Sequence, residues 1–294
     1  MKKPPCARLA LRVCLAFLAF AEAGQRIPAE SEIHFRLVHN TLIVVSLFSD
    51  PKEPIDFVFD TGADTSVVDP SILPRLPFVP LDRIRQTTLS GVQLVPRGLI
   101  RSLTVGSMRV NNVPVLVQDL TELHKLDPHI MGIAGQSFIA HFNYFIDYRK
   151  HLLRIEQDHE IRDAINGNHV PIEATENRTF VVADGRAFNR AKLNLILDSG
   201  ADSVVLLRAA SHALRIPEQE TVLETTSSGH VRLNSGRIYD LTVGSMRLRN
   251  LRAVLPAVDP REHIGDGILP TALFQTIYIN NRDGFAVFNP GVGH

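Results

Sequence analysis

The sequence has no tryptophan, only 2 cysteines and no excess of either charge among its 294 residues. Two cysteines exclude a disulfide-dense scaffold and a four-cysteine zinc site. Lysine plus arginine and aspartate plus glutamate each number 31, and this balance argues against a nucleic-acid-binding protein, which usually carries a basic excess. The 12 histidines show no metal-ligand spacing, so we expect neither a metal nor a cofactor.

Long hydrophobic runs are also missing, because no segment approaches the ~20 apolar residues that a membrane-spanning helix needs. A short run from Val13 to Ala21 follows a basic N-terminus and leads into the small residues of Ala21-Glu22-Ala23. This pattern is typical of a signal peptide. We therefore predict a signal peptide over residues 1–23, cleaved after Ala23, and a secreted or periplasmic product without stable membrane insertion. A membrane anchor is the alternative.

Cleavage there would change the composition of the mature chain. Both cysteines, Cys6 and Cys14, lie in the predicted signal peptide, so the mature chain would have neither a thiol nucleophile nor a disulfide. Four basic residues and one acidic residue leave with it, which makes the mature chain mildly acidic.

The rest of the chain contains an internal repeat with a spacing of 138 residues. The string LTVGSMR occurs at Leu103–Arg109 and again at Leu241–Arg247. The string DTGAD at Asp60–Asp64 recurs as DSGAD at Asp198–Asp202. The further matches at this spacing are Thr41, Val44, Thr87, Thr88 and Gly91 with Thr179, Val182, Thr225, Thr226 and Gly229. Several blocks at one spacing indicate a duplication rather than chance.

The duplication predicts two halves joined by a connector. The stretch from Gln157 to His169 is polar and contains few apolar residues, as linkers do. We place the N-terminal half at residues 24–160, the linker at 161–168 and the C-terminal half at 169–294.

Each half is mostly β in its local pattern. Short apolar runs rich in β-branched residues, such as Leu42–Phe48 and Val113–Val117, alternate with turn signals, which favours a sandwich or a barrel. Helical patterns are short and cover residues 136–141, 205–213 and 271–274. We therefore expect an all-β fold with few short helices.

The chemistry of the repeat lies in its two aspartates. Asp60 and Asp198 each follow a buried apolar run and precede a hydroxyl residue and a glycine that lets the backbone turn sharply. If the halves pack about a pseudo-twofold axis, the two carboxyls face each other and share one proton. Such a pair supplies a general base and a general acid for the attack of one water on a peptide carbonyl.

Phe59–Asp64 and Leu197–Asp202 resemble the active-site loops of retropepsin-type aspartic proteases. Two copies in one chain resemble the bilobal, pepsin-like arrangement, and most of the mature chain is similar to the bacterial exported retropepsin-like family. The resemblance implies two acid-protease β-barrel lobes related by a pseudo-twofold axis. It also implies a monomeric aspartic endopeptidase that needs no cofactor and hydrolyses an extended peptide or protein segment between its lobes.

The resemblance also assigns roles to individual residues. The catalytic dyad would be Asp60 and Asp198. The dyad-supporting residues would be Thr61, Gly62, Ser199 and Gly200. The substrate-binding residues would be Ala63, Asp64, Ala201 and Asp202, together with Gly91 and Gly229 near the tips of two flap hairpins.

The chain departs from the family pattern in the segments expected to pass beneath the two loops. These are Gly132–Gly135 and Asp266–Leu269, and Pro270 follows the second where a glycine is usual. The arginine that retroviral enzymes place next is replaced by Gln136 and Thr271.

Ala63 and Ala201 stand where pepsin-like loops carry a hydroxyl residue. A hydroxyl donor would favour the ionised dyad, so its absence predicts a weakly acidic rather than a strongly acidic optimum.

Two other functions share this fold. The first is a non-catalytic peptide-binding protein, and the second is a protease that needs processing. Outside the repeat motifs, Arg247, Arg249 and Arg252 form a basic cluster that we interpret as a solvated face.

Overall fold

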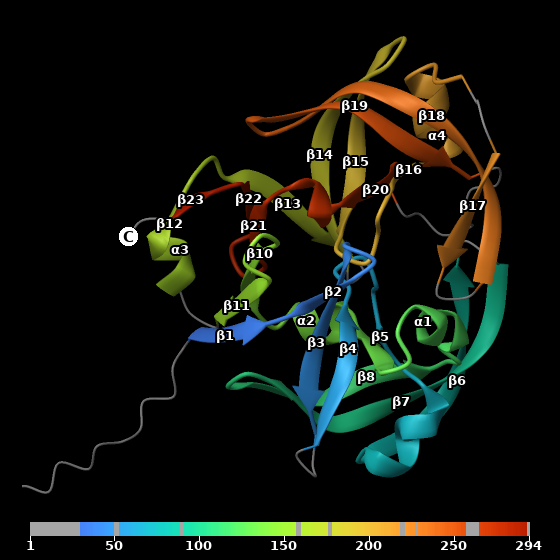
Figure 1. Cartoon of the computed structure of the whole chain (residues 1–294), viewed down its shortest axis with the longest axis vertical. Helices are drawn as coiled ribbons and strands as arrows, with labels where there is room; N and C mark the ends of the chain where they lie inside the picture. The colour runs from blue at the N-terminus through green and yellow to red at the C-terminus, as the bar shows by residue number, and fades with distance from the viewer. Residues whose placement is uncertain are drawn as a thin grey trace, which may run out of the picture.

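The computed structural model describes residues 30–49, 53–88, 91–156, 160–175, 178–217, 221–226, 229–256 and 265–292 (Figure 1). The predicted signal peptide lies outside these ranges. Strands dominate them, and the longest helices have six residues. No helix in the described ranges is long and apolar enough to span a bilayer.

The N-terminal lobe is a closed barrel of six strands, in the order β3-β4-β9-β5-β8-β7. The ring closes where Phe48 of β3 pairs with Thr104 of β7. Its strands are β3 (Leu42–Phe48), β4 (Pro54–Phe59), β5 (Ser66–Val68), β7 (Gly91–Val105), β8 (Met108–Val117) and β9 (Ile130–Ala134).

The C-terminal lobe repeats this barrel with the strand order β14-β15-β20-β16-β19-β18. Pairing of β14 with β18, for example of Asp184 with Thr242, closes the ring. Its strands are β14 (Arg178–Arg186), β15 (Arg190–Asp198), β16 (Val204–Leu206), β18 (Gly229–Val243), β19 (Met246–Leu255) and β20 (Gly267–Pro270). The same order of strands in both rings confirms the predicted all-β, two-lobed duplication.

One of the proposed sequence matches is wrong in register. Val58 and Ile196 are 138 residues apart, but Val58 pairs with Val44 whereas Ile196 pairs with Phe180. The structural counterpart of Val44 is therefore Phe180, and the match of Val44 with Val182 is a coincidence. Compared with the first barrel, the first strand of the second barrel is offset by two residues relative to its neighbour. A shift of two residues keeps the equivalent side chains facing inward, because side chains alternate along a strand.

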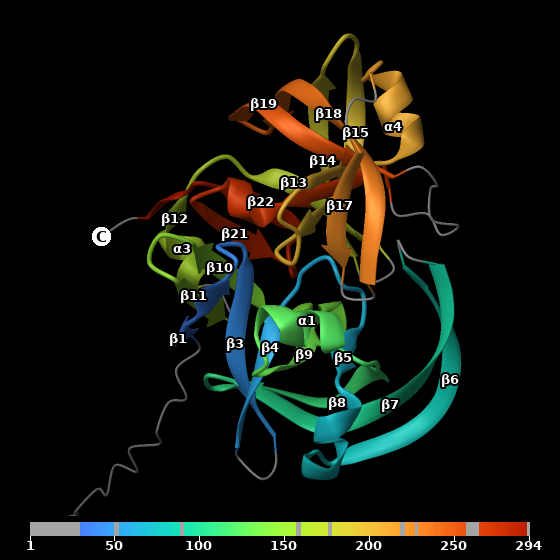
Figure 2. The same ribbon diagram turned by 45° about the vertical axis from the view of Figure 1, so that its right-hand side comes forward.

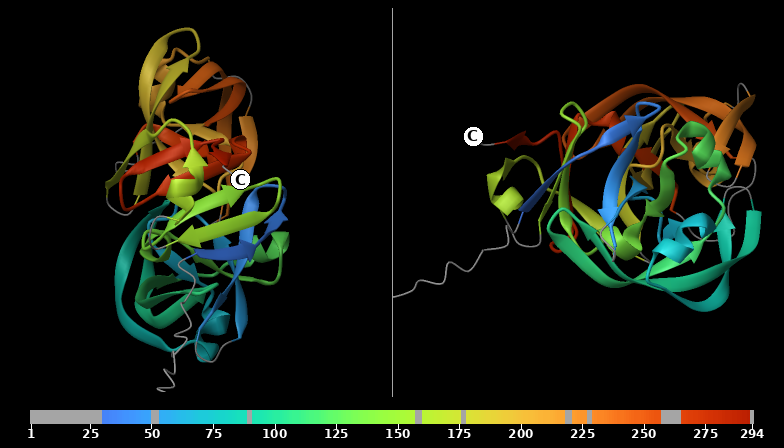
Figure 3. Two further views of the ribbon diagram at one scale, coloured as in Figure 1. Left: turned by 90° about the vertical axis from the view of Figure 1, so that its left-hand side faces the viewer. Right: turned by 60° about the horizontal axis from the view of Figure 1, so that its bottom comes forward.

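A further sheet region joins the lobes, with the order β1-β11-β10-β21-β22-β13. At its centre β10 of the first half lies beside β21 of the second (Figure 3, left). In this pairing Tyr144 lies opposite Ile279. Its strands are β1 (Glu30–His34), β10 (Asn143–Asp147), β11 (Leu152–Glu156), β13 (Val170–Thr175), β21 (Thr276–Asn280) and β22 (Phe285–Phe288).

The stretch expected as a linker contains regular structure. Residues 161–168 include most of α3 (Glu160–Ala164) and β12 (Ile165–Asn166), and β12 pairs with β23 (Gly291–Val292). The boundaries assigned from the sequence stay a prediction. The remaining strand, β2 (Arg36–Val38), pairs over its three residues with the start of β3 and extends the first barrel.

Two long hairpins project from the barrels on the same side of the molecule (Figure 2). One joins β6 (Phe78–Thr88) to β7, and the other joins β17 (Thr221–Thr226) to β18. Gly91 pairs with Thr88 and Gly229 pairs with Thr226, and these are the last pairs before the tips. The tips themselves, residues 89–90 and 227–228, lie outside the described residues.

Helices are short connectors. The expected helix over residues 205–213 begins only at Arg208, because Val205 and Leu206 pair within the barrel as part of β16. The helices other than α3 are α1 (Thr121–Leu126), α2 (Gln136–Ile139), α4 (Arg208–Ala213), η1 (Pro70–Arg75) and η2 (Thr271–Leu273). Of these, α1 and η1 were not expected from the sequence.

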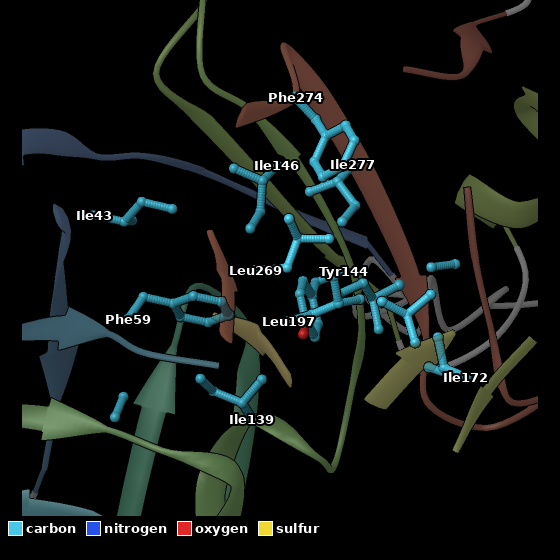
Figure 4. Close-up of a cluster of buried hydrophobic side chains, with 14 of the residues drawn as sticks. Ile43, Phe59, Ile139, Tyr144, Ile146, Ile172, Leu197, Leu269, Phe274 and Ile277 are labelled. Carbon is cyan, nitrogen blue, oxygen red and sulfur yellow. The ribbon is translucent and has the colours of Figure 1, made fainter. Parts of the chain in front are cut away.

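The hydrophobic core extends without a break from one lobe to the other. Side chains of both halves meet in it, among them Phe59, Tyr144, Leu197, Leu269 and Ile277 (Figure 4). Because Phe59 and Leu197 immediately precede the two aspartates, this shared core fixes the place where the two loops emerge.

Candidate active site

Asp60 and Asp198 lie at the ends of equivalent strands. Phe59 and Leu197 are fully buried and anchor the end of each strand in the core. The aspartates that follow them are half-buried. Asp60 Oδ1 accepts hydrogen bonds from the amides of Gly62 at 2.9 Å and Ala63 at 3.1 Å. Asp198 Oδ1 accepts one from the amide of Gly200 at 2.6 Å. Each loop therefore folds its backbone around its own carboxylate.

The two loops are joined through their hydroxyl residues, Thr61 and Ser199, which are both buried. The Thr61 amide donates to Ser199 Oγ at 3.1 Å, and the Ser199 amide donates to Thr61 Oγ1 at 3.0 Å. The hydroxyls in turn donate to the opposite strand, Thr61 to the carbonyl of Leu197 at 2.9 Å and Ser199 to that of Phe59 at 2.6 Å. Four hydrogen bonds thus fix the position of one loop relative to the other.

Gly62 and Gly200 are required by the close approach of the opposite carboxyl. A Cβ on Gly200 would lie 2.6 Å from the carboxyl carbon of Asp60, and a Cβ on Gly62 would overlap the carboxyl of Asp198. Real Cβ contacts are not this short. The glycines therefore let each carboxyl lie against the backbone of the other loop, and the two carboxyls form one site.

Burial and mutual proximity perturb the ionisation of the pair. Burial raises the pKa of both Asp60 and Asp198, and the charge of Asp60 raises the pKa of Asp198 further. A hydrogen bond from Asp198 and the two amides of its own loop oppose the increase in the pKa of Asp60. The pKa of Asp198 is raised further than that of Asp60, and two carboxyls this close are placed to share one proton.

Asp64 lies at the edge of this site and is met by a residue from the other lobe. Its side chain is 47% exposed, and its Oδ2 accepts a 3.4 Å hydrogen bond from Arg178 at the start of β14. The guanidinium is only 12% exposed. Sequence reasoning missed Arg178, because the contact joins positions 114 residues apart without any motif. Asp202, the counterpart of Asp64, is exposed.

The sequence around both aspartates is similar to that of a known protein family. A family model described as aspartyl protease matches the chain twice, over residues 46–138 and 183–271. The chain belongs to the aspartyl protease family. Each match covers most of one barrel and one of the two aspartates. No curated protein matches the chain significantly.

In this member of the aspartyl protease family two uncharged residues occupy the places where the retroviral pattern predicts arginine. Gln136 is buried, and its side-chain amide donates to the carbonyl of Thr61 at 2.7 Å. Thr271 is also buried, and its hydroxyl lies 2.6 Å from the hydroxyl of Tyr148. Gln136 thus supports the first loop from below, within its own lobe.

Tyr148 is a second residue that sequence reasoning missed. It extends from the end of β10 in the first half to Thr271 in the second, and its amide donates to the carbonyl of Gln275 at 3.0 Å. Burial raises the pKa of its phenol, and the charge of Asp198 adds to the increase. Tyr148 is therefore part of the surroundings of the second aspartate.

Pro270 leaves the strand beneath the second loop intact. Strand β20 stays in parallel register with β15 up to the pairing of Asp198 with Pro270. At the start of the same strand, the Asp266 carboxylate accepts a 2.8 Å hydrogen bond from the amide of Asn194. In the described part of the chain, no group of three or more histidine, cysteine, aspartate or glutamate side chains could hold a metal ion.

Proposed function

We propose that this protein is an aspartic endopeptidase that hydrolyses peptide bonds of an extended polypeptide bound between its lobes. The observation that carries the proposal is the pair of half-buried carboxyls, Asp60 and Asp198, fixed against each other by the reciprocal hydrogen bonds of Thr61 and Ser199. Membership of the aspartyl protease family supports the reaction class.

In this proposal one carboxyl of the pair is the general base and the other is the general acid. Ionised Asp60 removes a proton from a water molecule, and the water oxygen attacks the carbonyl carbon of the scissile peptide bond. Protonated Asp198 donates its proton to the carbonyl oxygen, which gives a tetrahedral diol. In the second step the carboxyls return one proton to the leaving nitrogen and take one from the diol, the C–N bond breaks, and the pair again holds one proton.

Substrate binding in this proposal uses the rest of the loops and the two hairpins. An extended peptide would lie over the carboxyls and pair its backbone with Ala63, Asp64, Ala201 and Asp202. The hairpins β6–β7 and β17–β18, with Gly91 and Gly229 beside their tips, would cover it as flaps that exclude water. Recognition of main chain in this way selects extended segments rather than folded ones.

The site needs one chain only, because each half supplies one aspartate, so we propose a monomer. We also propose export to the periplasm or beyond the cell, which rests on the signal-peptide pattern in residues 1–23. Fractionation of the source cells, with N-terminal sequencing of the recovered protein, tests this: a start at Gly24 in the exported fraction is expected.

The experiment that tests the activity is incubation of the purified protein, without residues 1–23, with a diverse peptide library between pH 3 and pH 7. Cleavage is expected, with loss by ~10²–10⁴-fold in Asp60→Asn and in Asp198→Asn. Asp163→Asn, which changes an exposed carboxyl on α3, is the control and should keep full activity. A statine-type inhibitor should block the wild-type protein.

Peptide binding without cleavage at any pH would contradict the proposal and identify a non-catalytic peptide-binding protein. Activity that appears only after the chain has been cut would instead identify a protease that needs processing. Cleavage that persists in both aspartate variants would show that another site carries the reaction.

A further inference from the structure

A cavity of about 720 Å³ opens in the C-terminal lobe, away from the two aspartates. Arg186, Arg190, Lys192 and Arg247 line it with four cations, and Asp184 and Asp240 line it with two carboxylates. It lies where β14 ends and β15 begins. Because β15 then runs to Asp198, eight residues beyond Arg190, the strand separates the Cα atoms of Arg190 and Asp198 by up to about 26 Å. In Figure 1 this strand leads from the top of the molecule to its centre.

The buried carboxylate of Asp240 binds two of the four cations, Arg186 and Arg247. It accepts hydrogen bonds at 2.8 Å from Nε of Arg186 and from Nε of Arg247, and only 6% of Asp240 is exposed. These charge-assisted bonds hold both guanidinium groups at the wall of the cavity.

The other two cations are not bound by a carboxylate in this way, although Lys192 lies opposite Asp184 in the β14–β15 ladder. In the part of the chain that the structure describes, neither Arg190 nor Lys192 forms an ion pair. Arg190 also lies directly opposite Arg186 in the β14–β15 ladder, and like charges at facing positions destabilise a sheet. The cavity therefore has an excess of positive charge that an anion would neutralise.

The first lobe shows that the barrel does not need these charges. Thr104 and Thr242 hold the same place in the repeated LTVGSMR motif, and each pairs with the first strand of its own barrel. Around them the second lobe has charged residues where the first has an aromatic residue, a proline and a serine. The corresponding residues, first lobe before second, are Phe48 and Asp184, Pro54 and Lys192, and Ser102 and Asp240.

We propose that this cavity binds a small polyanion, a molecule that carries two or more phosphate or carboxylate groups. Its volume is within the range of small-molecule sites. Guanidinium groups bind phosphate and carboxylate through paired hydrogen bonds, and Arg186 and Arg247 are already oriented by Asp240. Arg247, which the sequence suggested as part of a solvated face, is in this proposal a wall of a binding site.

Isothermal titration calorimetry of the purified protein with two probes, tripolyphosphate and citrate, tests the proposal. Sodium chloride at equal ionic strength is the blank. We expect at least one probe to bind once per chain, and the tighter of the two identifies phosphate or carboxylate as the preferred group. Because the readout is the heat of binding, the result does not depend on peptidase activity.

The variant that tests the site is Arg190→Gln with Lys192→Gln, which removes the two cations that form no ion pair in the described ranges. We expect it to weaken binding at least tenfold, because each charged hydrogen bond contributes substantially. The matched control is Arg109→Gln, at the place of Arg247 in the first lobe, and it should bind within twofold of the wild type.

Unchanged thermal melting without a probe will show that the double variant folds, and Arg190→Gln alone is the second variant if it does not. Two results would overturn the proposal: neither probe binding above the chloride blank, or the folded cation variants binding as tightly as the wild type.

Discussion

The hydroxyls of Thr61 and Ser199 each accept a hydrogen bond from the other residue's backbone amide across the boundary between the lobes. The distance is 3.0 Å at the Thr61 hydroxyl and 3.1 Å at the Ser199 hydroxyl. Neither active-site loop is therefore complete without the opposite lobe. Two copies of one barrel thus generate a candidate site that neither copy contains alone.

Ser199→Ala should destabilise the protein, because the buried amide of Thr61 and carbonyl of Phe59 each lose a hydrogen-bond partner. A buried polar group left unpaired costs about 1–3 kcal/mol, so we expect a loss of about 2 kcal/mol or more in the free energy of unfolding by urea. Ser245→Ala in an exposed turn is the control and should change it by less than about 0.5 kcal/mol. Equal effects of the two substitutions would refute a special role for the contact.

A half-buried tyrosine, Tyr148, and a fully buried one, Tyr144, provide a sharper comparison. The hydroxyl of Tyr148 lies 2.6 Å from that of Thr271, whereas the buried hydroxyl of Tyr144 has no hydrogen-bond partner among the described residues. Tyr148→Phe should therefore lower the free energy of unfolding by about 1–3 kcal/mol, and Tyr144→Phe should leave it unchanged or raise it. Thermal and urea unfolding of both variants measure this, and the reverse order would show that the contact with Thr271 does not stabilise the fold.

The parts of the fold that repeat could be predicted from the sequence. Asp60 and Asp198 stand out because a motif with a turn-forming glycine follows an apolar run twice at one spacing, and a carboxylate at the end of a buried strand has few structural reasons to be there. The strand-like runs favoured a sandwich or a barrel, and the resemblance of the two loops to those of retropepsin-type proteases implied the barrel. The helix over residues 205–213 was placed too early because an apolar run does not distinguish a short buried strand from a helix.

The residues that could not be predicted act across long separations. Arg178 meets Asp64 from 114 residues away, and Tyr148 meets Thr271 from 123 residues away. Both contacts join the two lobes, so they depend on how the barrels pack rather than on any local pattern. The charged cavity was missed for a different reason: its cations come from different strands of one barrel, and no sequence motif marks their arrangement.

The raised pKa of Asp198 implies that this carboxyl contributes less to the stability of the folded protein as the pH rises. A carboxyl whose pKa is raised by folding binds its proton more tightly in the folded than in the unfolded state, so stability falls from the ordinary pKa of 3.8 upward through the raised value. Asp198→Asn removes this titration. Its melting temperature should match that of the wild type near pH 3.5 and exceed it at pH 7, where the ionised form is disfavoured by burial.

The matched variant for that comparison is Asp163→Asn, which changes an exposed carboxyl and should melt with the wild type at both values of pH. A melting temperature of Asp198→Asn below that of the wild type at pH 7 would mean that the second carboxyl is not held in its neutral form by the fold.

The alanines that follow the loop glycines should set the pH range of activity. Ala63 offers Asp60 only its amide, at 3.1 Å, where a serine would add a hydroxyl donor. Such a donor favours the ionised carboxylate, so Ala63→Ser should move the acidic limb of the pH–activity profile to lower pH. Ala201→Ser should move the alkaline limb to lower pH, because its hydroxyl would favour the ionised form of Asp198. The double variant should therefore shift the whole optimum downward, by roughly 0.5–1 pH unit.

Initial rates of peptide cleavage at closely spaced pH values measure these limbs, with the wild-type optimum expected at weakly acidic pH. Ala209→Ser, on the exposed side of α4, is the control and should leave the profile in place. A wild-type maximum around pH 2 would contradict the role assigned to the alanines, since burial without a hydroxyl donor keeps the pair protonated well above that value. A profile that stays fixed in the double variant would show that the amides alone determine the ionisation of the two carboxyls.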